Sequence, residues 1–164
     1  MTKITINTLR ENKLNNKKSV ACTAYSYWEA ALTEKAQMDW VLVRDSSANV
    51  EHGHKSTVFI SLDEMLSHMR AVARGNKYSF LVGDCPFGTY EKSDIQAVET
   101  AQAFIKAGAD CIKLERCFPE RIKAIADSGI LVFAHLGLTP QSVTSFGGYK
   151  VQGKTKESAQ QVLD

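Results

Sequence analysis

Short apolar runs alternate with longer amphipathic segments along most of the chain, and this alternation predicts the fold. Five runs are rich in the residues of buried strands, and they span residues 19–25, 40–45, 79–84, 111–115 and 130–135. The runs are largely apolar throughout and do not alternate strictly with polar residues. We therefore expect parallel strands that are buried on both faces of a sheet.

Helices are expected between these strands because most intervening segments open with a capping signal. Ser26 and Ser61 are each followed three residues later by Glu, and Ser93 is followed at the same spacing by Gln. This spacing is typical of the capping box, and Pro119 suits the first turn of a fourth helix. Glycines end the last three helices, at Gly75, Gly108 and Gly129.

Five βα units in succession fit either a doubly wound parallel sheet or part of a (β/α)8 barrel. The chain contains neither a GxGxxG turn nor a P-loop, which argues against a nucleotide-binding sheet. At 164 residues we expect a single domain over residues 1–164.

Composition narrows the possible functions. A net charge of +2 argues for neither a nucleic-acid nor a membrane-surface partner, and Lys13, Lys17 and Lys18 are interpreted as a solvated N-terminal turn. No apolar stretch approaches the roughly 20 residues of a membrane span. Four cysteines without a CxxC pair indicate buried thiols in a reducing compartment, so we expect a cytoplasmic protein.

Three of the predicted strands finish on an acidic residue. These residues are Asp45, Asp84 and Glu115. Ligands of parallel α/β folds lie outside the carboxyl ends of the strands, and three carboxylates gathered there would bind a divalent cation such as Mg²⁺. The alternative is that each acid only caps the helix that follows it.

Two further segments carry candidate chemistry. Residues 137–154 form a long Gly-rich stretch that breaks the βα rhythm, and a loop of that length is usually functional or disordered. His52 and His54 lack a third ligand at a convincing spacing, so we interpret them as part of a loop and not as a zinc site.

The run HLGLTPQS, which begins at His135, continues as FGGYKVQG from Phe146. These motifs strongly resemble the ketopantoate hydroxymethyltransferase family. The resemblance extends over nearly the whole chain, through Thr23-Ala24-Tyr25, Asp45-Ser46, Gly53-His54, Ser56-Thr57, Asp84, Pro86-Phe87, Lys113 and Glu115.

The resemblance implies a (β/α)8 TIM-type barrel that assembles into a large homo-oligomer, typically a decamer. It also implies a reaction of pantothenate biosynthesis. The family transfers a hydroxymethyl group from 5,10-methylenetetrahydrofolate to the 2-oxo acid 3-methyl-2-oxobutanoate, with Mg²⁺, and the product is ketopantoate (2-dehydropantoate). A 2-oxo acid chelates Mg²⁺ through its carboxylate and keto oxygens, and the metal then stabilises the enolate formed at C3.

Positions that match the family pattern imply individual roles. Asp45 and Asp84 resemble the direct metal ligands, which also hold the substrate, and Glu115 resembles a third acid that acts directly or through water. Ser46 resembles the residue that holds the substrate carboxylate.

The resemblance implies catalytic roles for two more residues. Lys113 resembles the residue that binds the keto acid and balances its charge, and His135 resembles a histidine lining the site. The alternative for Lys113 is a purely structural salt bridge. The alternative for His135 is a strand-end histidine whose nitrogens are hydrogen-bonded and which has no catalytic role.

The chain departs from the family pattern in two ways. It stops at Asp164, short of the roughly 250 residues of a complete barrel, so we expect about the first five βα units without the later glutamate that serves the family as general base. Arg44 and Arg116 stand where the family has glycine, and Ser26 stands where it has aspartate. The arginines either pair with the neighbouring acids, bind a more anionic substrate, or point outward.

Two alternatives to the family reaction follow. One is a truncated or degenerate homologue that binds or assembles without catalysis. The other is a related aldolase or lyase acting on 2-oxo acids, which uses the same metal and uses Lys113 differently, for example to form a Schiff base.

Overall fold

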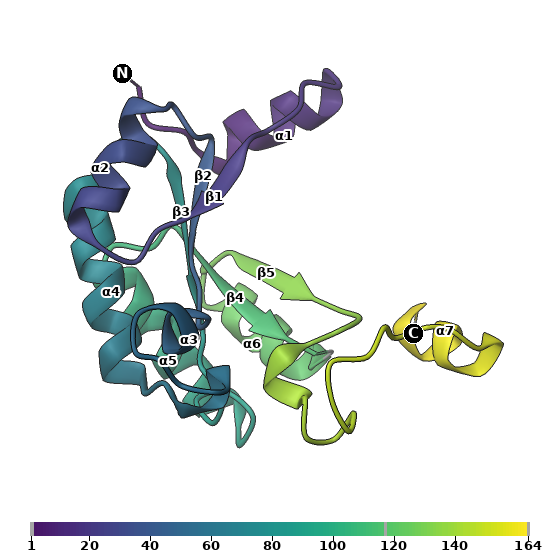
Figure 1. Ribbon diagram of the computed structural model, residues 1–164. Coiled ribbons are helices and arrows are strands. Elements are labelled where there is room, and N and C mark those ends of the chain that lie inside the picture. Colours follow the sequence, from purple (N-terminus) through teal and green to yellow (C-terminus); the bar gives the residue numbers. More distant parts are fainter. Residues whose placement is uncertain (1, 117, 164) are drawn as a thin grey trace.

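A five-stranded parallel sheet forms the centre of the computed structural model, which describes residues 2–116 and 118–163 (Figure 1). The strands follow one another in the sheet in chain order, β1-β2-β3-β4-β5. They are β1 (Ala21–Thr23), β2 (Trp40–Val43), β3 (Phe80–Asp84), β4 (Cys111–Glu115) and β5 (Val132–His135). All five lie within the predicted runs, and the parallel pairing is confirmed.

Helices occupy the segments between the strands and both ends of the described chain. They are α1 (Ile6–Leu14), α2 (Tyr27–Lys35), α3 (Ser47–Val50), α4 (Leu62–Gly75), α5 (Asp94–Lys106), α6 (Pro119–Asp127) and α7 (Lys156–Leu163), with 3₁₀ turns at Thr57–Phe59 and Pro140–Ser142. None of the helices in the described residues is long and apolar enough to cross a membrane.

The predicted capping residues begin three of these helices. The hydroxyls of Ser26 and Ser61 accept hydrogen bonds from the backbone N–H three residues later, and the reciprocal glutamate bonds complete both capping boxes. Ser93 accepts from the backbone N–H of Gln96, and Pro119 stands in the first turn of α6. Local sequence therefore sets where α2, α4, α5 and α6 start.

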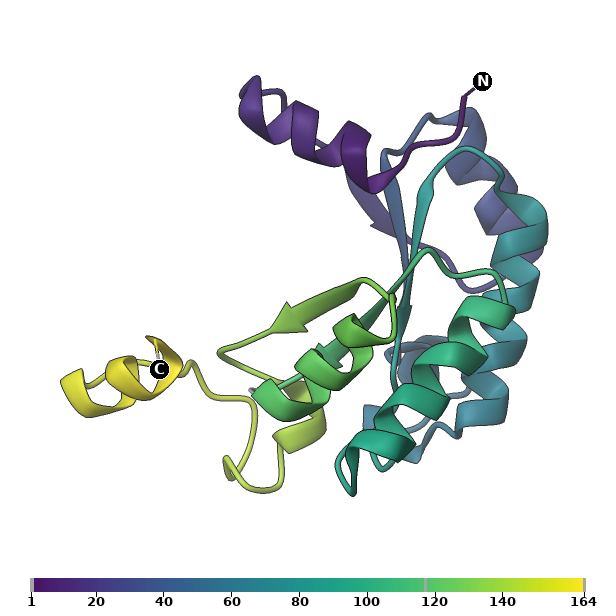
Figure 2. The same ribbon diagram turned by 180° about the vertical axis from the view of Figure 1, so that it is seen from behind.

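The order of the strands distinguishes between the two predicted architectures. A doubly wound sheet reverses its strand order and carries helices on both faces, whereas this order is sequential. Helices α2, α4, α5 and α6 follow one another along one side of the curved sheet (Figures 1 and 2). This is the arrangement of consecutive βα units in a (β/α)8 barrel, as predicted.

Close packing of α5 against the sheet positions the middle of the site. A Cβ added at Gly83 would lie 2.4 Å from Cδ1 of Phe104, a fully buried side chain of α5. Glycine at this position lets the helix approach the strand immediately before Asp84.

Helix α1 was not expected, and the interpretation of Lys13 as part of a turn is wrong. Thr5 caps the helix by accepting from the backbone N–H of Thr8. Ile6 and Leu9 pack against the side chains at the amino ends of the strands, on the sheet face opposite α2 (Figure 1). With so few apolar positions the helix depends on tertiary packing, so its sequence pattern is weak.

Two of the three cysteines that the structure describes are buried, which agrees with the prediction of buried thiols for most of them, while Cys22 is partly exposed. Cys22, Cys85 and Cys111 are free, and Cys85 and Cys111 are buried; Cys117 lies outside the described residues. Burial raises the pKa of the Cys111 thiol to about 12, so this side chain packs as a small neutral group.

Candidate active site

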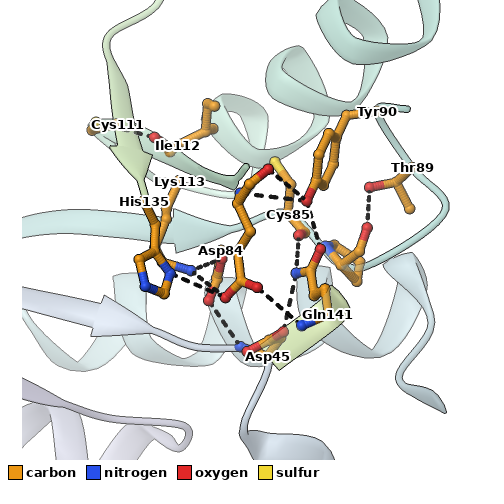
Figure 3. Close-up of polar contacts among 12 residues, drawn as sticks. Asp45, Asp84, Cys85, Thr89, Tyr90, Cys111, Ile112, Lys113, His135 and Gln141 are labelled. Atoms are coloured by element: carbon orange, nitrogen blue, oxygen red, sulfur yellow. Dashed lines mark hydrogen bonds and ion pairs between the residues drawn. The ribbon is translucent and has the colours of Figure 1, made fainter. Parts of the chain in front are cut away.

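Three carboxylates meet at the carboxyl ends of neighbouring strands (Figure 3). Asp45 follows β2, Asp84 ends β3 and Glu115 ends β4, and each side chain is completely buried. One oxygen from each residue lies within 4.8 Å of an oxygen of the other two. The structure thus brings together the acids that the sequence pattern singled out, while their role as metal ligands remains a prediction.

Lys113 lies inside this acidic cluster. Its Nζ is 2.7 Å from Asp84 Oδ1 and 3.2 Å from Glu115 Oε1, and the residue is only 4% exposed. Lys113 and Glu115 are two residues apart on β4, so both project from the same face of the sheet. Burial alone would lower the pKa of Lys113, but Asp84 and Glu115 together raise it above its ordinary value. The side chain is therefore a buried ammonium ion.

Asp84 has a strongly perturbed acidity. Burial is the largest cause, and it raises the pKa of Asp84 from 3.8 to about 7 against the opposing effect of Lys113. The nearby charges of Asp45 and Glu115 raise the pKa of Asp84 further. A group with such a pKa gives up its proton near neutral pH when a cation becomes available.

His135 joins the cluster from β5. The strand register pairs Glu115 with His135, and His135 Nδ1 lies 3.2 Å from Glu115 Oε1. The imidazole is partly exposed at 26%, so it forms the solvent-facing edge of the site. This contact agrees with both predictions for His135: a hydrogen-bonded histidine at the end of a strand, or a residue that takes part in the active site.

Ser46 lies beside the cluster without a polar contact to the acids among the described residues. Its Oγ is 3.0 Å from the hydroxyl of Tyr25, which comes from the segment after β1. Tyr25 itself is buried, so it holds the serine hydroxyl in place. The structure therefore positions Ser46 next to Asp45 and leaves its predicted carboxylate-binding role untested.

Gln141 is the main site residue that the sequence did not assign. Its side-chain N–H groups donate to Asp45 Oδ2 at 3.0 Å and to the carbonyl of Cys85 at 2.9 Å, and its backbone N–H donates to Glu115 Oε2 at 3.0 Å. Tyr90 donates its hydroxyl to Gln141 Oε1 at 2.5 Å. The sequence indicated only that residues 137–154 form a functional or disordered loop. In the structure, the 3₁₀ turn at Pro140–Ser142 brings Gln141 into contact with Asp45 and Glu115.

The two unexpected arginines do not pair with the acids. Within the described residues, no carboxylate oxygen lies within 4.0 Å of Arg44 or Arg116. Arg116 is exposed, its guanidinium lies 5.4 Å from the ring centre of Phe118, and its backbone has φ of +70°. Glycine adopts this conformation without strain, which is a physical reason to expect glycine at this position in the family pattern.

The carboxylate cluster suits a hard divalent cation. Among the described residues, Asp45 Oδ1 is buried and has no hydrogen-bond partner, an arrangement that costs free energy unless another group is bound there. Within the same part of the chain, Asp84 Oδ2 receives only a long 3.4 Å bond from the backbone N–H of Asp45. Oxygen donors of this kind are those that Mg²⁺ prefers.

We expect Gln141→Ala to loosen the site. The change removes two donors and the 2.5 Å acceptor of the Tyr90 hydroxyl, which then keeps only longer contacts to the Glu115 backbone, so the free energy of unfolding should fall by about 2 kcal/mol. Mg²⁺ affinity should fall roughly tenfold because Asp45 is no longer oriented. Urea unfolding and calorimetric Mg²⁺ titration measure both effects. Gln152→Ala, which removes only a local bond to the Lys150 carbonyl, is the control, and equal behaviour of the two variants would contradict the role of Gln141.

Mg²⁺ affinity should rise with pH up to about 7. Protons and the cation compete for Asp84, whose pKa is raised to about 7, so the neutral acid predominates at lower pH. At pH 6 we expect affinity about tenfold below its value at pH 8. Calorimetric titration at the two pH values measures this difference, and equal affinities would contradict a site in which the cation displaces a proton from Asp84.

The fold and the site together define a class: a parallel α/β protein of the barrel type with a buried carboxylate and lysine site at the carboxyl ends of its strands. Solved structures support the fold. A phosphonopyruvate hydrolase structure with oxalate and Mg²⁺ gives a TM-score of 0.65 at 20% identity, covering 82% of this chain and 52% of that chain. An oxaloacetate acetylhydrolase structure gives 0.61 at 14% identity, covering 80% and 53%.

The model of the ketopantoate hydroxymethyltransferase family matches residues 3–164, so the chain belongs to this family. A mitochondrial 3-methyl-2-oxobutanoate hydroxymethyltransferase of Oryza sativa subsp. japonica is 48% identical over 99% of this chain and 42% of its own length. The enzyme of that name from Gloeobacter violaceus is 45% identical over 98% of this chain and 64% of its own length. The chain therefore spans about half the length of these relatives.

Proposed function

We propose that the chain belongs to an enzyme that transfers a hydroxymethyl group from 5,10-methylenetetrahydrofolate to 3-methyl-2-oxobutanoate and so forms ketopantoate. Family membership supports this reaction, since relatives named 3-methyl-2-oxobutanoate hydroxymethyltransferase match almost the whole chain. The observation that carries the proposal is the buried cluster of Asp45, Asp84 and Glu115 around Lys113. Such a combination of a metal site and a fixed positive charge would stabilise the negative charge that develops on a 2-oxo acid when it forms an enolate.

Asp45 and Asp84 would hold Mg²⁺ directly, and Glu115 would complete the set directly or through water. The unpartnered oxygen of Asp45 and the weakly bonded oxygen of Asp84 support this assignment. When bound, the metal supplies Lewis-acid polarisation of the keto acid. Gln141 would keep Asp45 in position through its donated hydrogen bond.

Lys113 would provide the second positive charge of the site. Its raised pKa keeps it protonated, so it can donate to the keto oxygen as negative charge develops there. Ser46, held by Tyr25, would donate to the substrate carboxylate. His135 would line the open side of the site and stay oriented by Glu115.

The same charges argue against Schiff-base chemistry at Lys113. An imine forms from a neutral amine, whereas this ammonium ion contacts Asp84 and Glu115 and has a raised pKa. A related aldolase or lyase of that mechanism is therefore disfavoured. Borohydride reduction in the presence of substrate should leave the mass of the protein unchanged.

We also propose a cytoplasmic location and a homo-oligomer. The rice relative is named as mitochondrial, so membership of the family does not by itself set the location. Static light scattering of the native protein measures the mass of the assembly directly. A mass equal to that of one protomer would contradict the proposed homo-oligomer.

Turnover is the test of the proposed reaction. The native protein should form ketopantoate from 3-methyl-2-oxobutanoate and 5,10-methylenetetrahydrofolate when Mg²⁺ is present, and EDTA should stop the reaction. Mass spectrometry of the products measures both results. Metal-dependent binding of the keto acid without product would favour the degenerate homologue, and the absence of both would overturn the proposal.

A further inference from the structure

Arg116 carries a positive charge that the acidic cluster does not use. It directly follows Glu115 at the end of β4, and it stands where the family pattern has glycine. Among residues 2–116 and 118–163, no carboxylate oxygen lies within 4.0 Å of its guanidinium, which lies 5.4 Å from the ring centre of Phe118. The side chain is exposed, so its charge is accessible to a ligand.

A surface cavity of about 350 Å³ borders both Arg116 and the 3₁₀ turn that reaches the acids. Its walls also include the aromatic ring of Phe87 and three hydroxyl side chains, those of Ser142, Thr144 and Ser145. Gln141 lines the same cavity and donates to Asp45, so the cavity adjoins the proposed metal site (Figure 3). Among the described residues that line this cavity, Arg116 is the only one with a charge.

A second cavity, of about 170 Å³, shares Arg116 with the first. Thr139 lines it, is only 2% exposed, and has a hydroxyl without a hydrogen-bond partner in the described part of the chain. A buried polar atom without a partner costs free energy, so a bound group that accepts from this hydroxyl would be favoured. No acidic residue of the described chain lines this cavity either. Both cavities therefore favour an anionic ligand over a cationic one.

Of the two proposed substrates, the folate is the one that needs a further cation. The single carboxylate of the keto acid would already meet the metal and Ser46, and Lys113 balances its developing charge. 5,10-Methylenetetrahydrofolate, in contrast, ends in a glutamate joined to a flat benzoyl ring, far from the carbon that it transfers. The planar fork of an arginine binds a carboxylate through two parallel hydrogen bonds, and a half-exposed ring such as Phe87 packs against a flat ring.

We propose that Arg116 binds the glutamate carboxylate of the folate cosubstrate and so contributes to the choice of that cosubstrate. The benzoyl ring would lie in the larger cavity against Phe87. The inference rests on the proposed reaction, which supplies the folate. The backbone of Arg116 has φ of +70°, which glycine adopts more readily than a residue with a side chain. A carboxylate bound to the guanidinium would offset this cost of replacing the glycine.

Calorimetric titration with two unreactive folates tests the proposal without turnover. The probes are 5-formyltetrahydrofolate and 5-formyltetrahydropteroate, which lacks the glutamate, each added with MgCl₂ and 3-methyl-2-oxobutanoate present. The native protein should bind the first about tenfold more tightly than the second, the effect of one hydrogen-bonded charge pair. This preference should disappear in Arg116→Gln and in Arg116→Gly, while the affinity for the pteroate stays unchanged.

Arg74→Gln is the matched control, because Arg74 is an exposed arginine in the last turn of α4 and should not affect either probe. Arg116 is also exposed, so its replacement should not disturb folding. No preference for the glutamate in the native protein, or a preference that persists in both Arg116 variants, would overturn the inference and leave the proposed reaction standing. A native protein that binds neither probe would overturn the folate cosubstrate and the inference together.

Discussion

Replacing Asp84 by asparagine should lower Mg²⁺ affinity by at least about 100-fold, since even residues that only orient metal ligands cost 10- to 100-fold when changed. Asparagine keeps the size of the side chain and can still accept the hydrogen bond of Lys113. It removes one of the two charges expected to contact the cation directly, in a completely buried position where no water can replace it. Turnover should fall with metal binding.

Calorimetric Mg²⁺ titration of Asp84→Asn measures this loss, with circular dichroism to establish that the variant is folded. Asp63→Asn is the matched control, because Asp63 is an exposed acid in the first turn of α4. The control should bind Mg²⁺ as the native chain does. Native affinity in Asp84→Asn would show that the buried acids are structural.

Replacing Lys113 by methionine should destabilise the metal-free chain by about 3–5 kcal/mol, the cost of breaking a buried ion pair by removing one partner. In the described residues, Lys113 is the only lysine or arginine within 4.0 Å of the buried acids. Methionine fills a similar volume without the charge. The lost stability therefore measures the electrostatic contribution of Lys113 and not the cost of a cavity. Mg²⁺ should restore part of the stability by neutralising the same carboxylates.

Urea unfolding of Lys113→Met, with and without Mg²⁺, measures both effects. Lys123→Met is the control, because Lys123 pairs with Asp127 at the surface and should contribute less than about 1 kcal/mol. Lys113→Arg keeps the charge and should retain part of the lost stability. A Lys113→Met variant as stable as Lys123→Met would contradict the account of the cluster.

The strands and the acids could be predicted because their signals are local. Buried parallel strands have few polar residues, so an acid at the end of each run stands out, and parallel pairing places those ends at one edge of the sheet. Asp45, Asp84 and Glu115 were found in this way. The serine caps likewise marked the starts of three helices.

Gln141 and α1 could not be found with the same rules because their contacts are long-range. Gln141 reaches Asp45 across 96 positions of the chain, and no periodic pattern in residues 137–154 indicates which side chain turns inward. Helix α1 has few apolar residues, and packing against the sheet face opposite α2 stabilises it. His52 and His68 likewise lie 16 positions apart in the chain, and the path of a loop brings their Nε2 atoms to within 2.9 Å of each other.

The most direct test of the central claim is a crystal structure of the chain with MnCl₂ and 3-methyl-2-oxobutanoate, using the anomalous signal of manganese to locate the ion. We predict a manganese peak coordinated by Asp45 and Asp84, with the keto acid bound to the ion and Lys113 beside it. Crystals that contain the keto acid but show no manganese at these carboxylates would contradict the claim that they form a metal site for a 2-oxo acid.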